Sequence, residues 1–151
     1  MIRGVGFKIK QTMEKPLFCI FTNVNIEAFS WFCVPDQEEV WNESGNAPFF
    51  KNTDYTGKEF SSMIRHKCNI VFLKLQAYYS KVKYYNIHSY EDFIKSDCQI
   101  LMLIYDCEFV EIYSKNEDIT QTIYSNAINK KFDDVTLITD LNDNRQRFDI
   151  L

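Results

Sequence analysis

The alternation of hydrophobic and polar positions is clearest in the second half of the chain. A β-branched apolar run there is long enough for a strand and too short for most helices. Two further apolar runs flank Asp106-Cys107 and predict a hairpin, although this pair is not the Asn-Gly or Asp-Gly that fixes a tight register. The expected strands of this half cover residues 69–75, 99–105, 108–114 and 135–139.

Two helices are expected between these strands. Ser89 begins a short helix with capping-box spacing. Asn116 caps a longer helix, in which Ile119 and Ile123 share one face and acidic residues occupy the first turn. Residues 69–139 therefore run strand, helix, strand, strand, helix, strand, which is the order of ferredoxin-like folds.

The first half of the chain has a more broken pattern. Val5, Phe7 and Ile9 alternate with polar residues, which predicts a strand, and Thr56 begins a capping box. The other expected elements are a short helix after Pro16, strands at 29–34 and 38–42 around Pro35, a surface loop at 43–55, a loop at 76–87 and a short terminal strand at 145–150.

These elements predict a single α+β domain over residues 1–151. We expect a mixed, mostly antiparallel sheet with about three helices, mainly on one face, and a ferredoxin-like βαββαβ order in residues 69–139. An irregular α+β sheet that merely passes through this order is the alternative.

Composition narrows the class of protein. Of the 151 residues, 46% are hydrophobic, which suits one globular core and is too high for disorder. The net charge of −4 argues against a general nucleic-acid binder, and no apolar run is long enough to span a bilayer. The N-terminus alternates polar and apolar residues, unlike a signal peptide. Five scattered cysteines predict free, mostly buried thiols in a reducing cytoplasm.

Charge is unevenly distributed along the chain. Residues 1–83 carry 11 basic and 8 acidic side chains, whereas residues 84–151 carry 6 basic and 13 acidic ones. An acidic half can attract a basic protein partner over a long range, although ordinary solvation and helix capping explain the same charges. The candidate interaction residues are Asp133, Asp134, Asp140, Asp143, Arg145, Arg147 and Trp41, the last because Trp is common at binding hot spots.

Motifs that carry chemistry are weak. Asp140-Leu141-Asn142-Asp143-Asn144 places oxygens like the start of an EF-hand loop, but Arg145 occupies the position that requires Gly. With two histidines and no Cys-x-x-Cys, the chain lacks a zinc ligand set. No serine or cysteine lies in a nucleophile motif, and Gly4-Val5-Gly6 lies within a strand. We therefore expect no metal, no cofactor and no catalytic residue.

Two segments resemble one family. They are residues 90–99, Tyr-Glu-Asp-Phe-Ile-Lys-Ser-Asp-Cys-Gln, and residues 132–145, which begin Phe-Asp-Asp-Val-Thr-Leu-Ile-Thr-Asp. Arg3-Gly4-Val5-Gly6-Phe7 and the segment around Trp31 agree with it, so the resemblance spans most of the chain. The family comprises small bacterial proteins of spore-forming Gram-positives, classed as a domain of unknown function. This resemblance implies a cytoplasmic bacterial protein and brings no catalytic residues with it.

Three functions remain open. The favoured interpretation is a small cytoplasmic binding protein without catalysis, of the immunity or inhibitor type, for a basic partner. The alternative is an enzyme or ligand-binding protein in which Asp140, Asp143, Arg145 and Arg147 form an anion-binding pocket near the C-terminus. A structural or sporulation-associated protein is the third. The sequence does not determine the oligomeric state.

Overall fold

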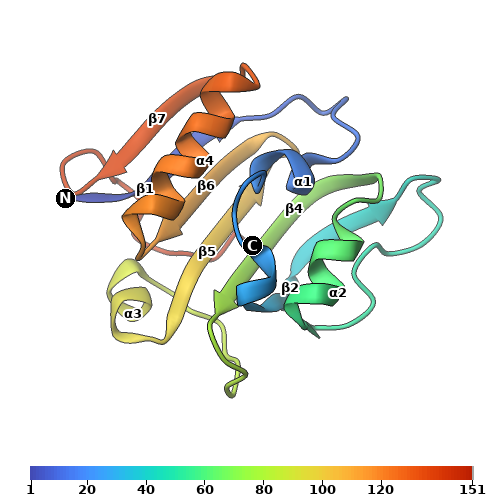
Figure 1. Ribbon diagram of the computed structural model, residues 1–151, viewed down its shortest axis with the longest axis horizontal. Helices are drawn as coiled ribbons and strands as arrows, with labels where there is room; N and C mark the ends of the chain where they lie inside the picture. Colours follow the sequence, from blue (N-terminus) through green and yellow to red (C-terminus); the bar gives the residue numbers. More distant parts are fainter. Residues whose placement is uncertain (151) are drawn as a thin grey trace.

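A seven-stranded sheet forms the centre of the molecule. The computed structural model describes residues 1–150. Within them the strands lie in the order β3-β2-β4-β5-β6-β1-β7, and every neighbouring pair is antiparallel (Figure 1). The strands are β1 (Ile2–Lys8), β2 (Ser30–Asn42), β3 (Asp54–Tyr55), β4 (Cys68–Tyr78), β5 (Cys98–Tyr105), β6 (Phe109–Ser114) and β7 (Asp133–Thr139).

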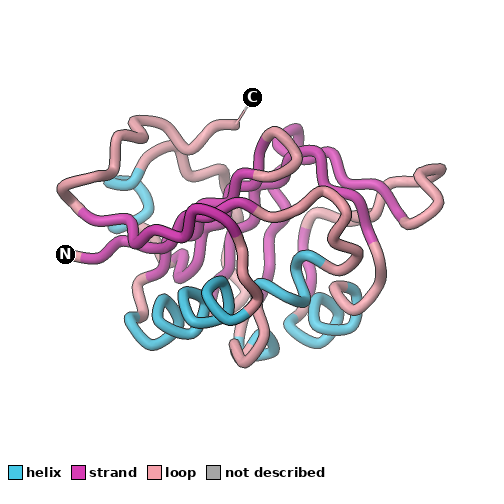
Figure 2. The backbone as a smooth tube through the Cα atoms, turned by 90° about the horizontal axis from the view of Figure 1, so that it is seen from above, coloured by secondary structure: helices cyan, strands magenta, loops and turns pink. Residues whose placement is uncertain are grey.

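Helices cover the two faces of the sheet unequally. Figure 2 shows most helices on one face, whereas one short helix and the C-terminal segment lie on the other. The first face carries α1 (Pro16–Ile20), the 3-10 helix η1 (Ile26–Ala28), α2 (Gly57–Met63) and α4 (Glu117–Asn129), and the second carries α3 (Tyr90–Lys95).

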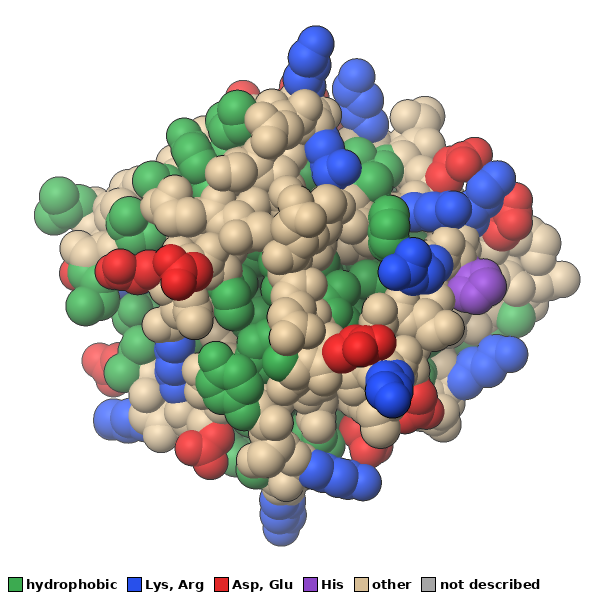
Figure 3. All heavy atoms as spheres, in the orientation of Figure 1, with side chains coloured by type: hydrophobic (Ala, Val, Ile, Leu, Met, Phe, Trp, Pro, Cys, Tyr) green, Lys and Arg blue, Asp and Glu red, His purple; other side chains and the backbone are tan. Residues whose placement is uncertain are grey.

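The larger hydrophobic core lies between the sheet and the helices of the first face. Trp31 of β2 is fully buried there, and its ring stacks on Phe60 of α2 with 4.2 Å between centroids. The Trp31 indole N–H donates to the carbonyl oxygen of Ile26 at 3.1 Å, so one side chain joins β2, α2 and η1. Seen from outside, this face shows hydrophobic side chains between the helices and charged ones around its margin (Figure 3).

A second, smaller core lies on the opposite face of the sheet. Leu101, Leu103 and Tyr113 point to this side and are fully buried. Phe148 covers them, with its ring centroid 4.7 Å from that of Tyr113. The segment that closes this face thus comes from the end of the chain.

Local signals in the sequence account for several element boundaries. Thr56 and Glu59 form the predicted capping box of α2, Ser89 caps α3, and Asn116 accepts from two N–H groups at the start of α4. The 105–109 hairpin turns through Asp106 and Cys107, which both have positive φ. The expected helix after Pro16 and the long amphipathic helix are both present.

Five expectations need correction. The predicted strands at 29–34 and 38–42 are one strand, β2, which continues through a register shift between Cys33 and Glu38. The predicted 43–55 loop ends in β3, and β4 extends to Tyr78 into the predicted 76–87 loop. The predicted strand at 145–150 is wrong, because these residues form no strand. The structure has four α-helices where about three were expected.

The ferredoxin-like arrangement is not found, although the linear order of elements is. In residues 69–139, β4 and β5 are direct antiparallel neighbours, whereas a split βαβ unit requires another strand between parallel ones. Strand β1, from the other end of the sequence, lies between β6 and β7. The fold is α+β with an antiparallel sheet.

Two further expectations concern the thiols and the membrane. All five cysteines are free, and Cys33, Cys68 and Cys98 are buried. Burial raises the pKa of Cys68 and of Cys98 to about 12, so both thiols stay protonated at neutral pH. No helix within residues 1–150 has the length and apolar character to cross a membrane.

Candidate functional site

The C-terminal segment, residues 140–150, crosses the second face of the sheet, and its residues 142–147 form one wall of a groove. Three groups of polar contacts attach it to the strands beneath. Each group joins residues far apart in the sequence, which is why sequence patterns alone do not reveal them.

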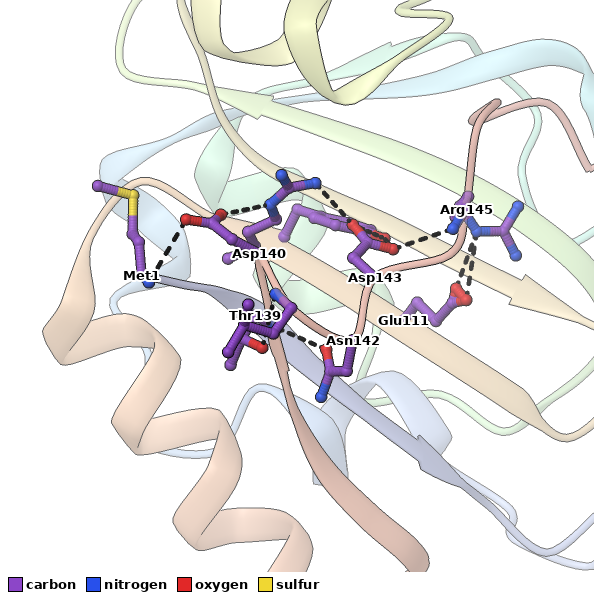
Figure 4. Close-up of polar contacts among 10 residues, drawn as sticks. Met1, Glu111, Thr139, Asp140, Asn142, Asp143 and Arg145 are labelled. Atoms are coloured by element: carbon purple, nitrogen blue, oxygen red, sulfur yellow. Dashed lines mark hydrogen bonds and ion pairs between the residues drawn. The ribbon is translucent and has the colours of Figure 1, made fainter.

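The first attachment is made by Arg3 of β1. Its Nε donates to Asp140 at 2.8 Å and its Nη1 to Asp143 at 3.1 Å (Figure 4), and its guanidinium lies 3.9 Å from the Tyr90 ring centroid. Asp143 also accepts from the Tyr113 hydroxyl at 3.1 Å, and only 4% of its side chain is exposed. The hydrogen bond to Asp140 raises the pKa of Arg3, and the same contact lowers the pKa of Asp140.

The second attachment is made by Arg145. Its Nε donates to both carboxylate oxygens of Glu111 in β6, at 2.9 and 3.2 Å. Its guanidinium carbon also lies 5.1 Å from the centre of the Tyr105 ring. Burial by itself would lower the pKa of Arg145, but the pairing with Glu111 raises it overall. This arginine is therefore a fixed cation whose charge is already matched.

The third attachment lies at the end of the segment. Asp149 is 3.2 Å from Nδ1 of His88 and 4.0 Å from Nζ of Lys74. Lys74 is fully buried and donates to Asn86 and to the carbonyl oxygen of Ile87. Burial lowers the pKa of Lys74 to about 8, and Asp149 opposes this shift.

A groove of about 670 Å³ lies beside these attachments, over β1, β6 and β7. Its volume is within the range of small-molecule sites. Its floor contains Gly6, Thr136 and Ile138, and residues 142–147 form a wall. The other lining residues are Phe7, Lys8, Tyr105, Phe109, Val110, Glu111 and Asp134.

An aromatic pair marks one end of the groove. Tyr105 and Phe109 flank the β5–β6 turn and stack with 5.3 Å between centroids. Lys8 lies 4.9 Å from the Phe109 centroid, and Arg145 contacts Tyr105. Both rings are thus engaged by a neighbouring ring and by a cation from within the protein.

Charges in the groove lining are balanced. Three cationic residues, Lys8, Arg145 and Arg147, face three acidic ones. Lys8 lies 3.5 Å from Asp134 and Arg145 pairs with Glu111, whereas Asp143 holds Arg3. The mostly exposed Arg147 lies 3.8 Å from Asp149. The groove therefore has no strong preference for an anion or a cation.

The structure brings some of the sequence-predicted residues together and separates others. Asp134, Asp143, Arg145 and Arg147 line the groove, whereas Asp140 lies outside it and contacts Arg3 and the N-terminal amine. Asp133 is exposed at the start of β7. Trp41 lies in β2, far along the sheet, and its indole N–H donates to Glu39 at 3.1 Å.

Folding pairs part of the acidic charge of the second half of the sequence with cations. Five of the acidic residues after position 83 contact cations. Three of these cations, Arg3, Lys8 and Lys74, come from the basic first half of the sequence. The five are Glu111, Asp134, Asp140, Asp143 and Asp149. These five carboxylates are therefore less available to a basic partner than the sequence alone suggests.

The loop that resembles the start of an EF-hand has its oxygens directed to protein donors. Asp140 and Asp143 accept from Arg3. The Asn142 carboxamide accepts from the Thr139 N–H at 2.7 Å and donates to the Leu137 oxygen at 2.9 Å, along the outer edge of β7. The loop therefore serves as a connection between β7 and the C-terminal segment.

Sequence reasoning missed most of the groove. The hydrophobic pattern identifies Gly6, Tyr105, Phe109 and Glu111 only as parts of strands. A usable signal was the cross-strand relationship across the predicted hairpin, which places Tyr105 opposite Phe109. No such signal connects Gly6 with residues 142–147.

Comparison with known proteins agrees with the resemblance noted in the sequence. The chain is 31% identical over 148 residues to "Uncharacterized protein YncE" of Bacillus subtilis (strain 168), covering 96% of this chain and 97% of that protein. No solved structure matches the chain. Residues 2–149 match the profile of a family described as "Protein of unknown function (DUF2691)". The chain belongs to this family.

Proposed function

We propose that this is a binding protein without catalytic activity and that the groove beside the C-terminal segment is its binding site. The observation that carries the proposal is the construction of the groove. Its wall is attached to the sheet through Arg3, Asp143, Arg145 and Glu111, so the cavity is shaped before a ligand arrives. A preformed site is what a binding protein requires.

The titrating groups of the groove favour binding over acid–base catalysis. General acids and bases work best with a pKa near neutrality. The ion pair with Glu111 holds the pKa of Arg145 above its ordinary value, and burial raises the pKa of Tyr105. Both shifts move these groups further from neutrality.

The anion-binding alternative finds less support in the same geometry. The Nε of Arg145 donates to Glu111, and its Nη1 donates to the carbonyl oxygen of Arg147. A basic partner is also less favoured than the sequence suggests, since Asp140 and Asp143 already contact Arg3. Long-range attraction of such a partner would depend on exposed carboxylates such as Asp133 and Asp134. The buried free thiols support a reducing, cytoplasmic location.

The test is an NMR titration of the isotope-labelled chain with a mixture of small carboxylates, phosphates, amines, sugars, heterocycles and capped dipeptides. We expect some members to shift the amide signals of Gly6, Thr136 and Asn144. The Gly6→Val variant, which fills the floor, should lose these shifts. Asn69→Val, which places the same side chain on β4 outside the groove, should keep them.

Two results would contradict the proposal. One is binding that maps to another part of the molecule in both variants. The other is an absence of shifts in the groove with every compound class. An added Cβ at Gly6 would lie 3.7 and 3.8 Å from its nearest neighbours, which is ordinary van der Waals contact, so we expect Gly6→Val to fold. The amide signals of this variant outside the groove check that it has folded.

A further inference from the structure

We infer that the groove takes an extended, uncharged peptide segment of a partner protein, with an aliphatic side chain seated over Gly6. This inference rests on the proposed binding function and names its ligand class. It is carried by the charge balance of the lining, its free amide groups, its apolar floor and the engaged state of its aromatic rings.

Charge balance argues for an uncharged ligand. The groove residues Lys8 and Arg145 face Asp134 and Glu111 at 3.5 and 2.9 Å. A charged ligand would compete with these two pairs, and breaking one leaves the displaced partner uncompensated. Arg147, the third cation of the lining, is mostly exposed and lies 3.8 Å from Asp149, so it too has an acidic neighbour. An uncharged ligand leaves both pairs in place.

Free amide groups on the wall suit a peptide backbone. Asn144 and Gln146 are exposed in the groove wall, and their side chains form no hydrogen bond within the described part of the chain. A carboxamide both donates and accepts, as does each peptide group. Two such side chains, two residues apart on the wall, can therefore pair with a backbone lying along it.

The floor offers an apolar seat of limited depth. Gly6 is half-buried in the middle of β1, and a Cβ built there would lie 3.8 Å from Ile138. This is ordinary van der Waals contact, so the missing side chain leaves space that no neighbour fills. An aliphatic side chain of the ligand can contact Ile138 through that space.

Ligands that are held by stacking on aromatic side chains fit less well. Sugars and nucleic-acid bases are commonly held by stacking on ring faces. Here Tyr105 and Phe109 stack on each other, and each also contacts a cation of the protein.

Addition of the peptide to β7 as an eighth strand is also disfavoured, because the Asn142 side chain already pairs with the N–H of Thr139 and the carbonyl oxygen of Leu137. The peptide should lie in the groove itself.

The experiment is a selection of short random peptides, displayed on phage, against the full chain. Enriched peptides are synthesised with capped ends and their affinity is measured for the wild type, Gly6→Val and Asn69→Val. We expect the Gly6→Val variant to bind at least about tenfold more weakly, which is about 1.4 kcal/mol. Asn69→Val should bind like the wild type.

Three further readouts define the ligand class. The enriched peptides should share an aliphatic residue, and its replacement by Gly should weaken binding about tenfold. The double variant Asn144→Ala and Gln146→Ala should also bind more weakly while unfolding like the wild type. Affinity should change little between about 0.05 and 0.5 M salt, because an uncharged peptide forms no ion pair with the groove.

Failure of the inference can be told apart from failure of the proposed function. Groove-dependent peptides that are charged, salt-sensitive or indifferent to the aliphatic residue would overturn the inference and leave the binding function standing. The same holds if phosphates or sugars bind at the groove and peptides do not. If neither peptides nor small molecules show dependence on Gly6, both are wrong.

Discussion

Arg145 lies with its Nε between the two carboxylate oxygens of Glu111, at 2.9 and 3.2 Å, and so joins the C-terminal segment to β6. Less than a fifth of either side chain is exposed. A pair this enclosed is screened little by salt, so it holds the groove wall in place under most solution conditions.

Replacing Glu111 by Gln should therefore have two effects. The fold should lose about 1–3 kcal/mol, because a charged hydrogen bond is lost and Arg145 stays enclosed. The freed guanidinium should also acquire an affinity for phosphate or sulfate that the wild type lacks. Urea unfolding with and without phosphate measures both effects. Equal stability of the two proteins, with no phosphate dependence, would contradict the assigned role.

Replacement by Ala should destabilise the fold much more at Gly4 than at Gly6. A Cβ at Gly4 would lie 1.8 Å from the carbonyl oxygen of Ile112, whereas at Gly6 the nearest atom is 3.7 Å away. Gly4→Ala should lose about 1–3 kcal/mol or more, because backbone must shift. Gly6→Ala should be within about 1 kcal/mol of the wild type. Thermal unfolding of the pair is the measurement, and similar losses in both would show that β1 and β6 are spaced differently.

Asp143 and Asp133 form a second matched pair. Asp143 accepts from Arg3, Tyr113 and the Arg145 N–H, whereas Asp133 is exposed and makes no side-chain hydrogen bond within residues 1–150. Asp143→Asn should lose about 1–3 kcal/mol, and Asp133→Asn should change stability by about 0.5 kcal/mol or less. Urea unfolding at neutral pH compares them. A larger loss at Asp133 would reverse the assignment of anchor and surface residue.

Lys74 should contribute increasing stability as the pH rises above 8, in the opposite direction to the buried thiols of Cys68 and Cys98. Its pKa in the fold is about 8, whereas an unfolded lysine titrates near 10.4, so the unfolded chain holds more protons in between. Stability rises with pH wherever the unfolded state binds more protons. This contribution should amount to roughly 2–3 kcal/mol between about pH 7 and pH 10.

The variant Lys74→Met isolates this contribution. Its stability should lack the rise, so the difference between the two proteins should change across that pH range. Lys58→Met, at an exposed position of α2, serves as the control and should follow the wild type. Parallel pH profiles for wild type and Lys74→Met, from urea unfolding at each pH, would rule out the lowered pKa.

Local chemistry explains which elements were predictable from sequence. The capping residues Thr56 and Asn116 act on N–H groups two or three positions away, so their helices could be placed correctly. The hairpin of β5 and β6 depends on neighbouring residues in the same way. Contacts of this kind join residues that are close in the sequence, so they can be predicted from it.

The failures all involve partners distant in sequence. The predicted strand ends at Leu75, but β4 continues to Tyr78, and the buried Gln76 side chain finds hydrogen-bond partners in Tyr85 and Ile87. The C-terminal residues were expected to form a strand, yet Phe148 is held by packing on Tyr113 and one backbone bond to His88. The place of β1 between β6 and β7 likewise has no local signal. The groove depends on the C-terminal segment and on the place of β1, so it was not predictable as a whole.

The Asn142 side chain has a consequence for how this molecule coexists with its own copies. An open sheet presents unpaired N–H and C=O groups at its margin, from which fibrous assemblies can grow. By accepting from Thr139 and donating to Leu137, the carboxamide imitates one peptide unit of an incoming chain. Asp134 adds a left-handed kink with φ of 53° at the other end of β7. Both features oppose edge-to-edge pairing of the β7 strands of two copies of this protein.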